Sequence, residues 1–312
     1  MRNYDADIAE NKRLLALSGI EKFGLVLTTD GAAIQRHAMM NVMALSVVFS
    51  SVMLLAVLDA SEHLAKGLHK DAEYIANSII PIIRQLPNPL CLDLVICDGA
   101  ADMTRFRALL CAVFPFVLSI WCISHITNRI FAKIGTNPDV EELIRKGKVI
   151  VDVFGSSKHF EHALFEGKCT EIFHKRRAFL HYCETRFGLY FIMLHRILQL
   201  RPVLVACVTC PQWLERHPEG EEDEVKDIIM DADFWTDVNQ LIVVMWPLIQ
   251  LIRLGDTNKP SLFAVYRATH LVKKRFGALE GRDIEYLDDV KEAFAEYEPE
   301  LLSTAAKVTC GV

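Results

Sequence analysis

Two aspartates could carry metal-dependent chemistry, because each follows an apolar run typical of a buried strand and precedes a glycine. Asp30 lies at the end of the segment 23–31 (FGLVLTTDG), and Asp98 lies near the end of 90–100 (LCLDLVICDGA). In an open α/β sheet, ligands gather at strand ends, and carboxylate oxygens suit hard cations such as Mg²⁺. Two such cations can hold the attacking and leaving oxygens of phosphoryl transfer. Asp-Gly pairs are also common in ordinary turns, so that interpretation stays open.

Cys122 and His125 form a C-x-x-H pair at the end of the apolar run 117–125, which predicts a strand. A structural zinc site needs about four ligands, usually from two such pairs. The Cys207-x-x-Cys210 pair has the spacing of a second half, but its apolar, helical context favours thiols that pack in a core. The chain has nine cysteines without a repeating spacing, which favours free thiols in a reducing compartment over a disulfide framework.

Basic residues gather in two clusters, 174–177 (HKRR) and 273–275 (KKR). Either cluster could contact phosphate groups, although such clusters usually form the solvated face of a helix. The chain carries 34 Lys and Arg against 40 Asp and Glu, a net charge of −6, which excludes a generally basic nucleic-acid coat protein. The acidic run 217–227 (HPEGEEDEVKD) is expected to be a solvated loop.

The elements that position these residues follow from hydrophobic patterning. Apolar runs and turn signals predict strands at 23–31, within 38–58, at 90–100 and at 117–125, with helices at 71–86 and 102–113. A short helix is expected before the first strand. The order β-β-β-α-β-α-β predicts a mixed α/β sheet, in which three antiparallel strands lead into parallel ones through helical crossovers. Pro81 predicts a kink or a late start in the first crossover helix.

The segment 38–58 (AMMNVMALSVVFSSVMLLAVL) allows two interpretations. It is as long and apolar as a membrane span, which needs ~20 residues. However, Ser50 and Ser51 interrupt it in the middle and Asn41 lies near one end. These polar positions favour a hairpin of two buried strands, which would complete a three-stranded meander with the first strand.

From residue 126 onward the pattern predicts helices only. The amphipathic segments are 140–154, 157–182, 188–207, 233–253 and 261–276. With 312 residues, 52% of them apolar, the chain is long enough for two domains and too apolar to be disordered. The polar N-terminus lacks the apolar region of a signal peptide, so a nuclear or cytoplasmic location is expected. The sequence contains no P-loop, G-x-G-x-x-G or G-x-S-x-G motif, which disfavours nucleotide-binding and serine-hydrolase functions.

Several short segments, taken in order, resemble the hAT superfamily of transposase-like proteins, and in particular their domain of unknown function with an RNase H-like core. The segments are LTTDG (27–31), Asn41, LDAS (58–61), KDAEYI (70–75), LVICDGAAD (94–102), WCISH (121–125), ETRFGLYFIMLHRIL (184–198) and the helical stretch 233–274. The resemblance covers about residues 20–276, and the shared order of the segments carries it rather than any single motif.

The resemblance implies an RNase H-like mixed sheet followed by an all-helical region. The implied domains are 1–20 (N-terminal helical extension), 21–135 (RNase H-like core), 136–276 (helical region) and 277–312 (C-terminal tail). In active members, three acidic residues bind Mg²⁺ or Mn²⁺ for DNA cleavage and strand transfer, and the resemblance makes Asp30 the first acid and Asp98 the second. It also matches Cys122 and His125 to the C-x-x-H beside the active centre, where they would help to position DNA or the active site.

The chain departs from the superfamily at several positions. The third acid, a glutamate in an Ala-Ser-Glu-Arg type motif, is missing, and nothing in the sequence selects Glu280, Glu285 or Glu292 as its replacement. Ala32 stands where an aromatic residue commonly follows the first Asp-Gly, and Gly99 stands where an asparagine commonly follows the second aspartate. The zinc-finger module often found upstream is also absent from this sequence.

These departures predict a truncated or domesticated transposase-like protein that is inactive as a nuclease. Its residual capability would be binding of DNA, of a protein partner or of a second copy, with neither a membrane nor a small-molecule substrate involved. The alternative is an active metal-dependent transposase or nuclease whose third acid comes from the C-terminal region or from a partner chain. Whether the protein is an enzyme therefore stays open at this point.

Overall fold

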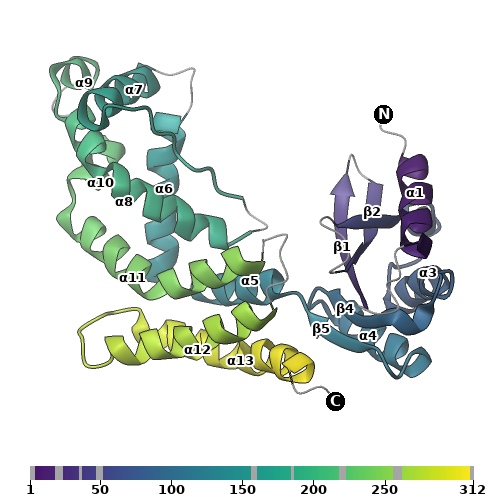
Figure 1. Cartoon of the computed structure of the whole chain (residues 1–312). Helices are drawn as coiled ribbons and strands as arrows, with labels where there is room; N and C mark the ends of the chain where they lie inside the picture. The colour runs from purple at the N-terminus through teal and green to yellow at the C-terminus, as the bar shows by residue number, and fades with distance from the viewer. Residues whose placement is uncertain are drawn as a thin grey trace. The chain divides into compact units, whose positions relative to one another are not determined.

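The computed structural model describes residues 4–17, 24–34, 37–46, 52–155, 160–183, 186–217, 223–255 and 262–309 (Figure 1). The chain divides into two compact units. The first comprises Met1–Ile126, Gly255–Tyr266 and Glu300–Val312, and the second comprises Thr127–Leu254 and Arg267–Pro299. The first change of unit along the chain falls inside a helix, α5 (Ile123–Ile134).

One five-stranded sheet forms the centre of the first unit. Its strands are β1 (Leu25–Ile34), β2 (His37–Leu45), β3 (Met53–Asp59), β4 (Leu92–Cys97) and β5 (Leu118–Trp121). They lie in the order β3-β2-β1-β4-β5. The first three strands pair antiparallel, whereas β4 is parallel to both β1 and β5. The prediction of a mixed α/β sheet, with a meander leading into parallel strands, is confirmed.

Helices cover one face of this sheet and close a single core. They are α1 (Tyr4–Leu17), α3 (Ala72–Arg84) and α4 (Ala101–Val113), and the shorter α2 (Ser61–Ala65) and a 3₁₀ turn (Pro89–Cys91) lie between strands. Leu27, Val42 and Leu55 from three strands pack in one cluster with Ile79 of α3 and Phe106 of α4. Alternate residues of β1, β2 and β3 face this core, as expected for a sheet covered on one side.

The apolar segment 38–58 forms the hairpin of β2 and β3, so the alternative of a membrane span is wrong. The register runs from Met39 opposite Asp59 to Ala44 opposite Met53, with one irregularity on the way. The serine pair that predicted the break falls outside the described residues. The segment forms a hairpin because residues along β2 alternate between buried and partly exposed positions. This two-residue repeat is typical of a strand and not of a helix.

Three local predictions in the first unit need correction. The Asp30-Gly31 pair is not a turn, because β1 continues through it to Ile34 while β2 pairs alongside. Pro81 does not delay its helix, since Asp71 Oδ1 accepts a hydrogen bond from Tyr74 N (2.9 Å) and fixes the start at Ala72. The strand predicted over 117–125 ends earlier, at Trp121, so the C-x-x-H pair extends from this strand end into α5.

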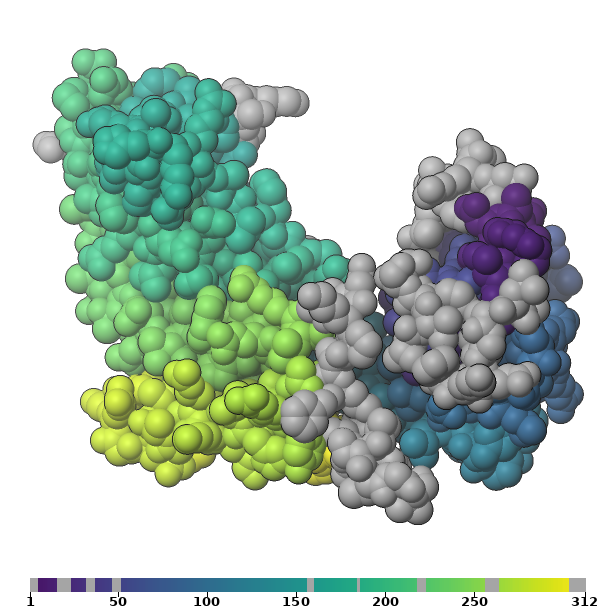
Figure 2. Space-filling view, viewed as in Figure 1, coloured from purple at the N-terminus to yellow at the C-terminus, as the bar shows by residue number. Residues whose placement is uncertain are grey.

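Among its described residues, the second unit contains helices and connecting segments but no strand. Besides most of α5, it contains α6 (Pro138–Gly155), α7 (Phe160–Phe173), α8 (Gly188–Val208), α9 (Pro211–Arg216), α10 (Glu224–Met230) and most of α11 (Ala232–Gly255), α12 (Leu262–Leu279) and α13 (Leu287–Thr309). The helices α6, α7 and α8 contact one another. Figure 2 shows the space-filling surface of the chain in the same view. The prediction that no strand follows residue 126 holds for the described part of the chain.

Two helix predictions in this unit are wrong in their extent. The single helix predicted over 157–182 ends at Phe173, and the described residues that follow, 174–183, are not helical. The acidic run 217–227 was expected to be a loop, but α10 begins within it at Glu224. Asp223 Oδ1 accepts a hydrogen bond from Lys226 N (3.0 Å), which is the N-cap contact that starts this helix. The expected C-terminal tail contains α13.

Two helices of the second unit, α8 and α11, have the length and apolar composition of a membrane span. Half of the apolar window in α8 and 44% of that in α11 are buried inside the protein. Core helices of water-soluble proteins meet the same length and composition criterion, so these two helices are weak evidence for a membrane.

Candidate metal centre

Asp30, Asp98 and His125 converge at one edge of the sheet. One ligand atom from each side chain lies within 4.8 Å of the others. The sheet topology explains the two aspartates, because β1 and β4 are parallel neighbours and Thr28 pairs with Ile96. Asp30 and Asp98 each follow that pair by two residues. The pairing of β1 with β4 stops at Thr28 and Ile96, and equivalent positions beyond it bring the two carboxylates together.

His125 reaches the same edge from the next strand in the sheet. β5 is parallel to β4, with Trp121 opposite Cys97, and Cys122 N donates a hydrogen bond to Cys97 O (2.7 Å). The chain then turns into α5, whose first turn carries His125. Its Nε2 lies 3.9 Å from Asp30 Oδ1. The third ligand therefore comes from the first turn of a helix, and the imidazole of His125 joins the two aspartates in the candidate metal site.

Backbone amides hold both aspartates in place. Asp30 N donates to Asn41 Oδ1 (3.0 Å) on the neighbouring strand, which gives the asparagine a structural role beside the site. Asp98 Oδ1 accepts from Ala100 N (2.9 Å) as the chain enters α4. The side chain of Asp30 is 52% exposed and that of His125 is 44% exposed, so water and ions can reach the site. Two carboxylates at this distance repel each other, which favours a cation between them.

The thiol of Cys122 lies next to the site, and its pKa depends on His125. Burial raises the pKa of Cys122, but the side chain and backbone of His125 and the backbone of Ser124 lower it by more, so the net pKa is below its ordinary value. The same contact with Cys122 raises the pKa of His125 against the effect of burial, and Asp30 and Asp98 add to the rise. Cys122 is not a member of the ligand cluster. Cys122 therefore acts on the site only through its contact with His125, whose pKa it raises.

A cavity of about 130 Å³ opens beside the two aspartates. Its lining includes Lys70 from the loop before α3 and Asp102 from the first turn of α4, neither of which the sequence analysis selected. Lys70 comes close to the strand, since a Cβ on Gly31 would lie 3.2 Å from its Nζ. Thr29 Oγ1 also lines the cavity; it is buried and has no hydrogen-bond partner in the described part of the protein. Asp102 follows Asp98 by four residues in the sequence. A helix that begins just after the strand keeps Asp102, in its first turn, near the strand end that carries Asp98.

The donor set fits a divalent cation. Two carboxylates suit Mg²⁺ and Mn²⁺, whereas an imidazole suits transition metals, so the combination favours Mn²⁺ over Mg²⁺. Three protein ligands also leave coordination positions for water or substrate. Thr29, which also lines the adjoining cavity, has a buried hydroxyl without a hydrogen-bond partner among the described residues.

The other predicted ligands do not join this cluster. Cys207 and Cys210 belong to the second unit, where Cys210 Sγ donates to Cys207 O (3.1 Å), and burial raises the pKa of Cys207 to about 12. They are not part of any group of three or more ligating side chains among the described residues. Packing thiols are therefore the better interpretation of that pair.

The three glutamates considered as a third acid also lie in the second unit. Glu280 pairs with Lys291 at 2.6 Å, and Glu292 lies 3.5 Å from Lys133. The backbone amide of Glu285 donates to Gln240 Oε1 (3.4 Å). Two of the three carboxylates thus already face a lysine within their own unit.

No protein-family description matches this chain, and no curated protein shows significant sequence similarity to it. The resemblance to the hAT superfamily therefore rests on the order of its short segments alone.

Proposed function

We propose that this chain is a transposase-derived protein with an RNase H-like core, in which Asp30, Asp98 and His125 bind one divalent cation without cutting DNA. Its remaining capability is binding of nucleic acid or of a protein partner. The convergence of the three side chains within 4.8 Å is the observation that carries the proposal. Such a cation would supply positive charge to a phosphate oxygen or to a bound water.

The sheet topology supports the RNase H-like assignment. The resemblance implies three antiparallel strands, then a parallel strand reached through a helix, then another. The strand order β3-β2-β1-β4-β5 with α3 and α4 as crossovers has this arrangement. The implied first and second acids also occupy equivalent positions on the two central parallel strands. Both points agree with the resemblance, although neither depends on it.

The composition of the site supports the absence of cleavage. Two-metal phosphoryl transfer needs enough carboxylate oxygens to hold two cations about 3.5–4 Å apart. Here the third ligand is the nitrogen of His125, and a single cation already requires both Asp30 and Asp98. One cation can bind a phosphate, but it leaves either the attacking or the leaving oxygen without a metal.

Calorimetric titration with Mn²⁺ tests the cation site. We expect one Mn²⁺ per chain, with weaker binding of Mg²⁺ and little effect of Mg²⁺ on the melting temperature, because a cation stabilises the fold only according to its affinity. Asp98→Asn should lower the Mn²⁺ affinity on the order of tenfold or more, since even the loss of a partner behind a ligand costs 10–100-fold. The matched control is Asp93→Asn, an exposed aspartate on the same strand. Equal Mn²⁺ affinity in the wild type and Asp98→Asn would refute the site.

A plasmid-nicking assay tests the absence of cleavage. We expect no Mn²⁺-dependent cleavage by the wild-type protein above that of an Asp98→Ala control. Cleavage that Asp98→Ala abolishes would overturn this part of the proposal while leaving the cation site intact. The calorimetric and cleavage results are therefore independent of each other.

One observation favours the alternative of an active nuclease. Asp102 lines the same cavity as Asp30 and Asp98, so a third carboxylate is available within the first unit itself. If the plasmid assay shows cleavage, Asp102→Asn distinguishes the sources of the third acid. Loss of cleavage in this variant would assign the role to Asp102, and unchanged cleavage would assign it to the C-terminal region or a partner chain.

A further inference from the structure

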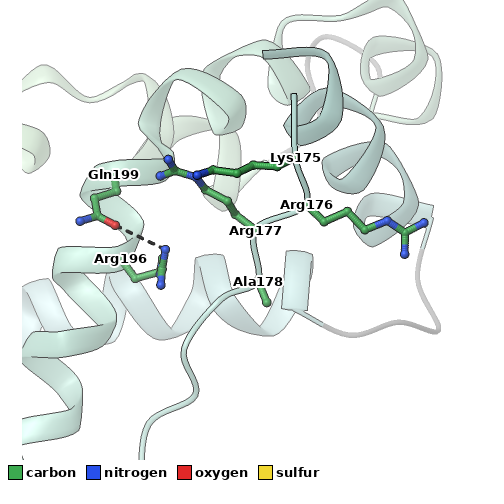
Figure 3. Close-up of a pocket in the computed structure, with 6 residues that line it drawn as sticks. All are labelled: Lys175, Arg176, Arg177, Ala178, Arg196 and Gln199. Atoms are coloured by element: carbon green, nitrogen blue, oxygen red, sulfur yellow. Dashed lines mark hydrogen bonds between the residues drawn. The ribbon is translucent and has the colours of Figure 1, made fainter. Parts of the chain in front are cut away.

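The second unit contains a concentration of positive charge around a surface cavity of about 730 Å³. The cavity is lined by Lys175, Arg176, Arg177, Ala178, Arg196 and Gln199 (Figure 3). We call the part formed by Lys175, Arg177 and Arg196 the basic notch. Lys175 and Gln199 are exposed, and Arg177 and Arg196 are partly exposed, so the notch opens to solvent.

The end of α7 creates the notch. The helix stops at Phe173, and His174 adopts a left-handed conformation (φ 55°) that turns the chain into a non-helical segment. In Figure 3, Lys175 and Arg177 extend toward α8, which carries Arg196 and Gln199, whereas Arg176 points away from them. Three cations from two elements thus meet on one side.

Buried contacts fix the segment in this position. The ring of Phe179, only 6% exposed, lies 4.6 Å from the ring of Phe165. Earlier in the segment, the buried thiol of Cys169 lies 3.6 Å from the carbonyl oxygen of Lys175, to which it can donate a hydrogen bond. The basic side chains are therefore attached to a backbone held on both sides, so the notch exists without a ligand to organise it.

Among the described residues, the charges of the notch have no acidic partners. Arg176, on the other side of the segment, lies 3.6 Å from Glu166. In contrast, no carboxylate lies within 4.0 Å of Lys175, Arg177 or Arg196 among the residues that the structure describes. Two of these cations contact neutral groups instead. The Arg177 guanidinium lies over the ring of Phe173. Arg196 Nη1 donates to Gln199 Oε1 (3.4 Å).

The neighbouring histidine experiences the same positive environment. His195 lies beside Arg196 on α8, with its ring 4.7 Å from that of Trp246. Burial lowers its pKa, and the charges of Arg253 and Arg196 lower it further, with no carboxylate contributing in the opposite direction. The positive field therefore extends around this part of α8 and is not balanced locally.

We propose that the basic notch binds the phosphate groups of a nucleic-acid backbone. Arginine presents a rigid fork of donors that matches phosphate oxygens, and lysine adds a mobile point charge. The cavity of about 730 Å³ is open and larger than one phosphate group, and its cations come from two separate elements, which suits a run of backbone phosphates better than an enclosed small molecule. All the residues involved belong to the second unit, so the inference does not depend on the cation site.

Fluorescence anisotropy with labelled duplex and single-stranded DNA tests this inference on the full-length protein, in EDTA so that the cation site is not involved. Three phosphate contacts should give a slope of log K against log salt of about −2.7 on duplex and about −2.1 on single strands. Lys175→Gln and Arg177→Gln should each weaken binding by about three- to tenfold and reduce the magnitude of the slope by about one contact. Lys175 is exposed, so this variant should fold normally.

Arg176→Gln is the matched control, because it removes the same charge from the same segment on the side that faces Glu166. We expect its affinity to stay within about twofold of the wild type at equal salt. An equal loss in Arg176→Gln and Arg177→Gln would overturn the proposal, since net charge alone would then explain binding. Undetectable DNA binding, or displacement of DNA by polyglutamate at least as readily as by inorganic phosphate and unlabelled DNA, would also overturn it.

Discussion

The two units hold charge clusters of opposite sign, and different structural features assemble them. In the first unit, Asp30 and Asp98 meet because they hold equivalent positions just beyond the pairing of two parallel strands. In the second, Lys175 and Arg177 face Arg196 because a helix stops and the chain continues in a non-helical segment beside α8. Sheet register makes the first cluster a direct result of topology, whereas the second depends on where one helix ends.

Each cluster is more stable with an ion of the opposite sign. Like charges a few ångströms apart repel one another, and a bound counter-ion removes that repulsion. The first cluster contains carboxylates and an imidazole, which fit a metal ion, and the second contains guanidinium and ammonium groups, which fit phosphate. The comparison therefore predicts that the same change of charge has opposite effects in the two units.

The largest expected effect comes from removing the support of the basic notch. Phe179→Ala deletes a ring that is 6% exposed and packs on Phe165, so it should lower the free energy of unfolding by about 3 kcal/mol. Urea denaturation followed by tryptophan fluorescence measures this. DNA binding should weaken as well, because the ring fixes the segment that carries Lys175 and Arg177.

Leu180→Ala is the control for this substitution, since Leu180 is adjacent in sequence but 38% exposed. A surface truncation of this kind should change stability by about 0.5 kcal/mol or less. If Phe179→Ala is as mild as Leu180→Ala, the aromatic contact does not anchor the segment that carries Lys175 and Arg177.

A smaller effect is expected when a lysine is neutralised in each unit, because the loss of positive charge should strengthen ion binding in the first unit and weaken it in the second. Lys70 lines the cavity next to Asp30 and Asp98, so Lys70→Gln should strengthen Mn²⁺ binding, by about two- to fivefold at low salt, as expected from loss of a like charge in a partly screened environment. Lys175→Gln in the second unit should instead weaken DNA binding. Calorimetry at two salt concentrations measures the first effect. Weaker Mn²⁺ binding in Lys70→Gln would mean that the lysine positions the aspartates.

Much of the first unit could be predicted from the sequence, because apolar strand runs followed by Asp-Gly leave a clear pattern, although β1 continues past Asp30 to Ile34. The meander, the crossover helices and the two carboxylates follow from apolar runs and their order. The resemblance predicted His125 beside the active centre, but its membership of the ligand cluster depends on β5 ending at Trp121 and on the first turn of α5. Lys70 and Asp102 were missed because loops and helix starts acquire their direction only from the packed fold.

The basic notch, unlike the metal site, could not be predicted from the sequence. The cluster 174–177 is visible in the sequence, but the apolar positions that continue to Phe179 suggested an unbroken helix. In a helix, Lys175 and Arg177 would point in different directions, whereas the non-helical backbone of this segment lets both extend toward α8 (Figure 3). Arg196 lies in a helix whose other residues are mostly apolar, so nothing in its local sequence indicated a binding surface.

The smallest expected effect is a pH dependence that arises beside the notch. Burial, with the charges of Arg253 and Arg196, holds the pKa of His195 below its ordinary value in the folded protein. The unfolded chain therefore takes up this proton first as the pH falls through about 6.5, and the folded state loses stability until its own His195 is protonated. His195→Gln removes this linkage, so the variant should lose less stability than the wild type between pH 7.5 and 5.5, as measured by urea denaturation. An identical loss in both proteins would show that the arginines exert little field at His195, and would weaken the case that the notch is electrostatically unbalanced.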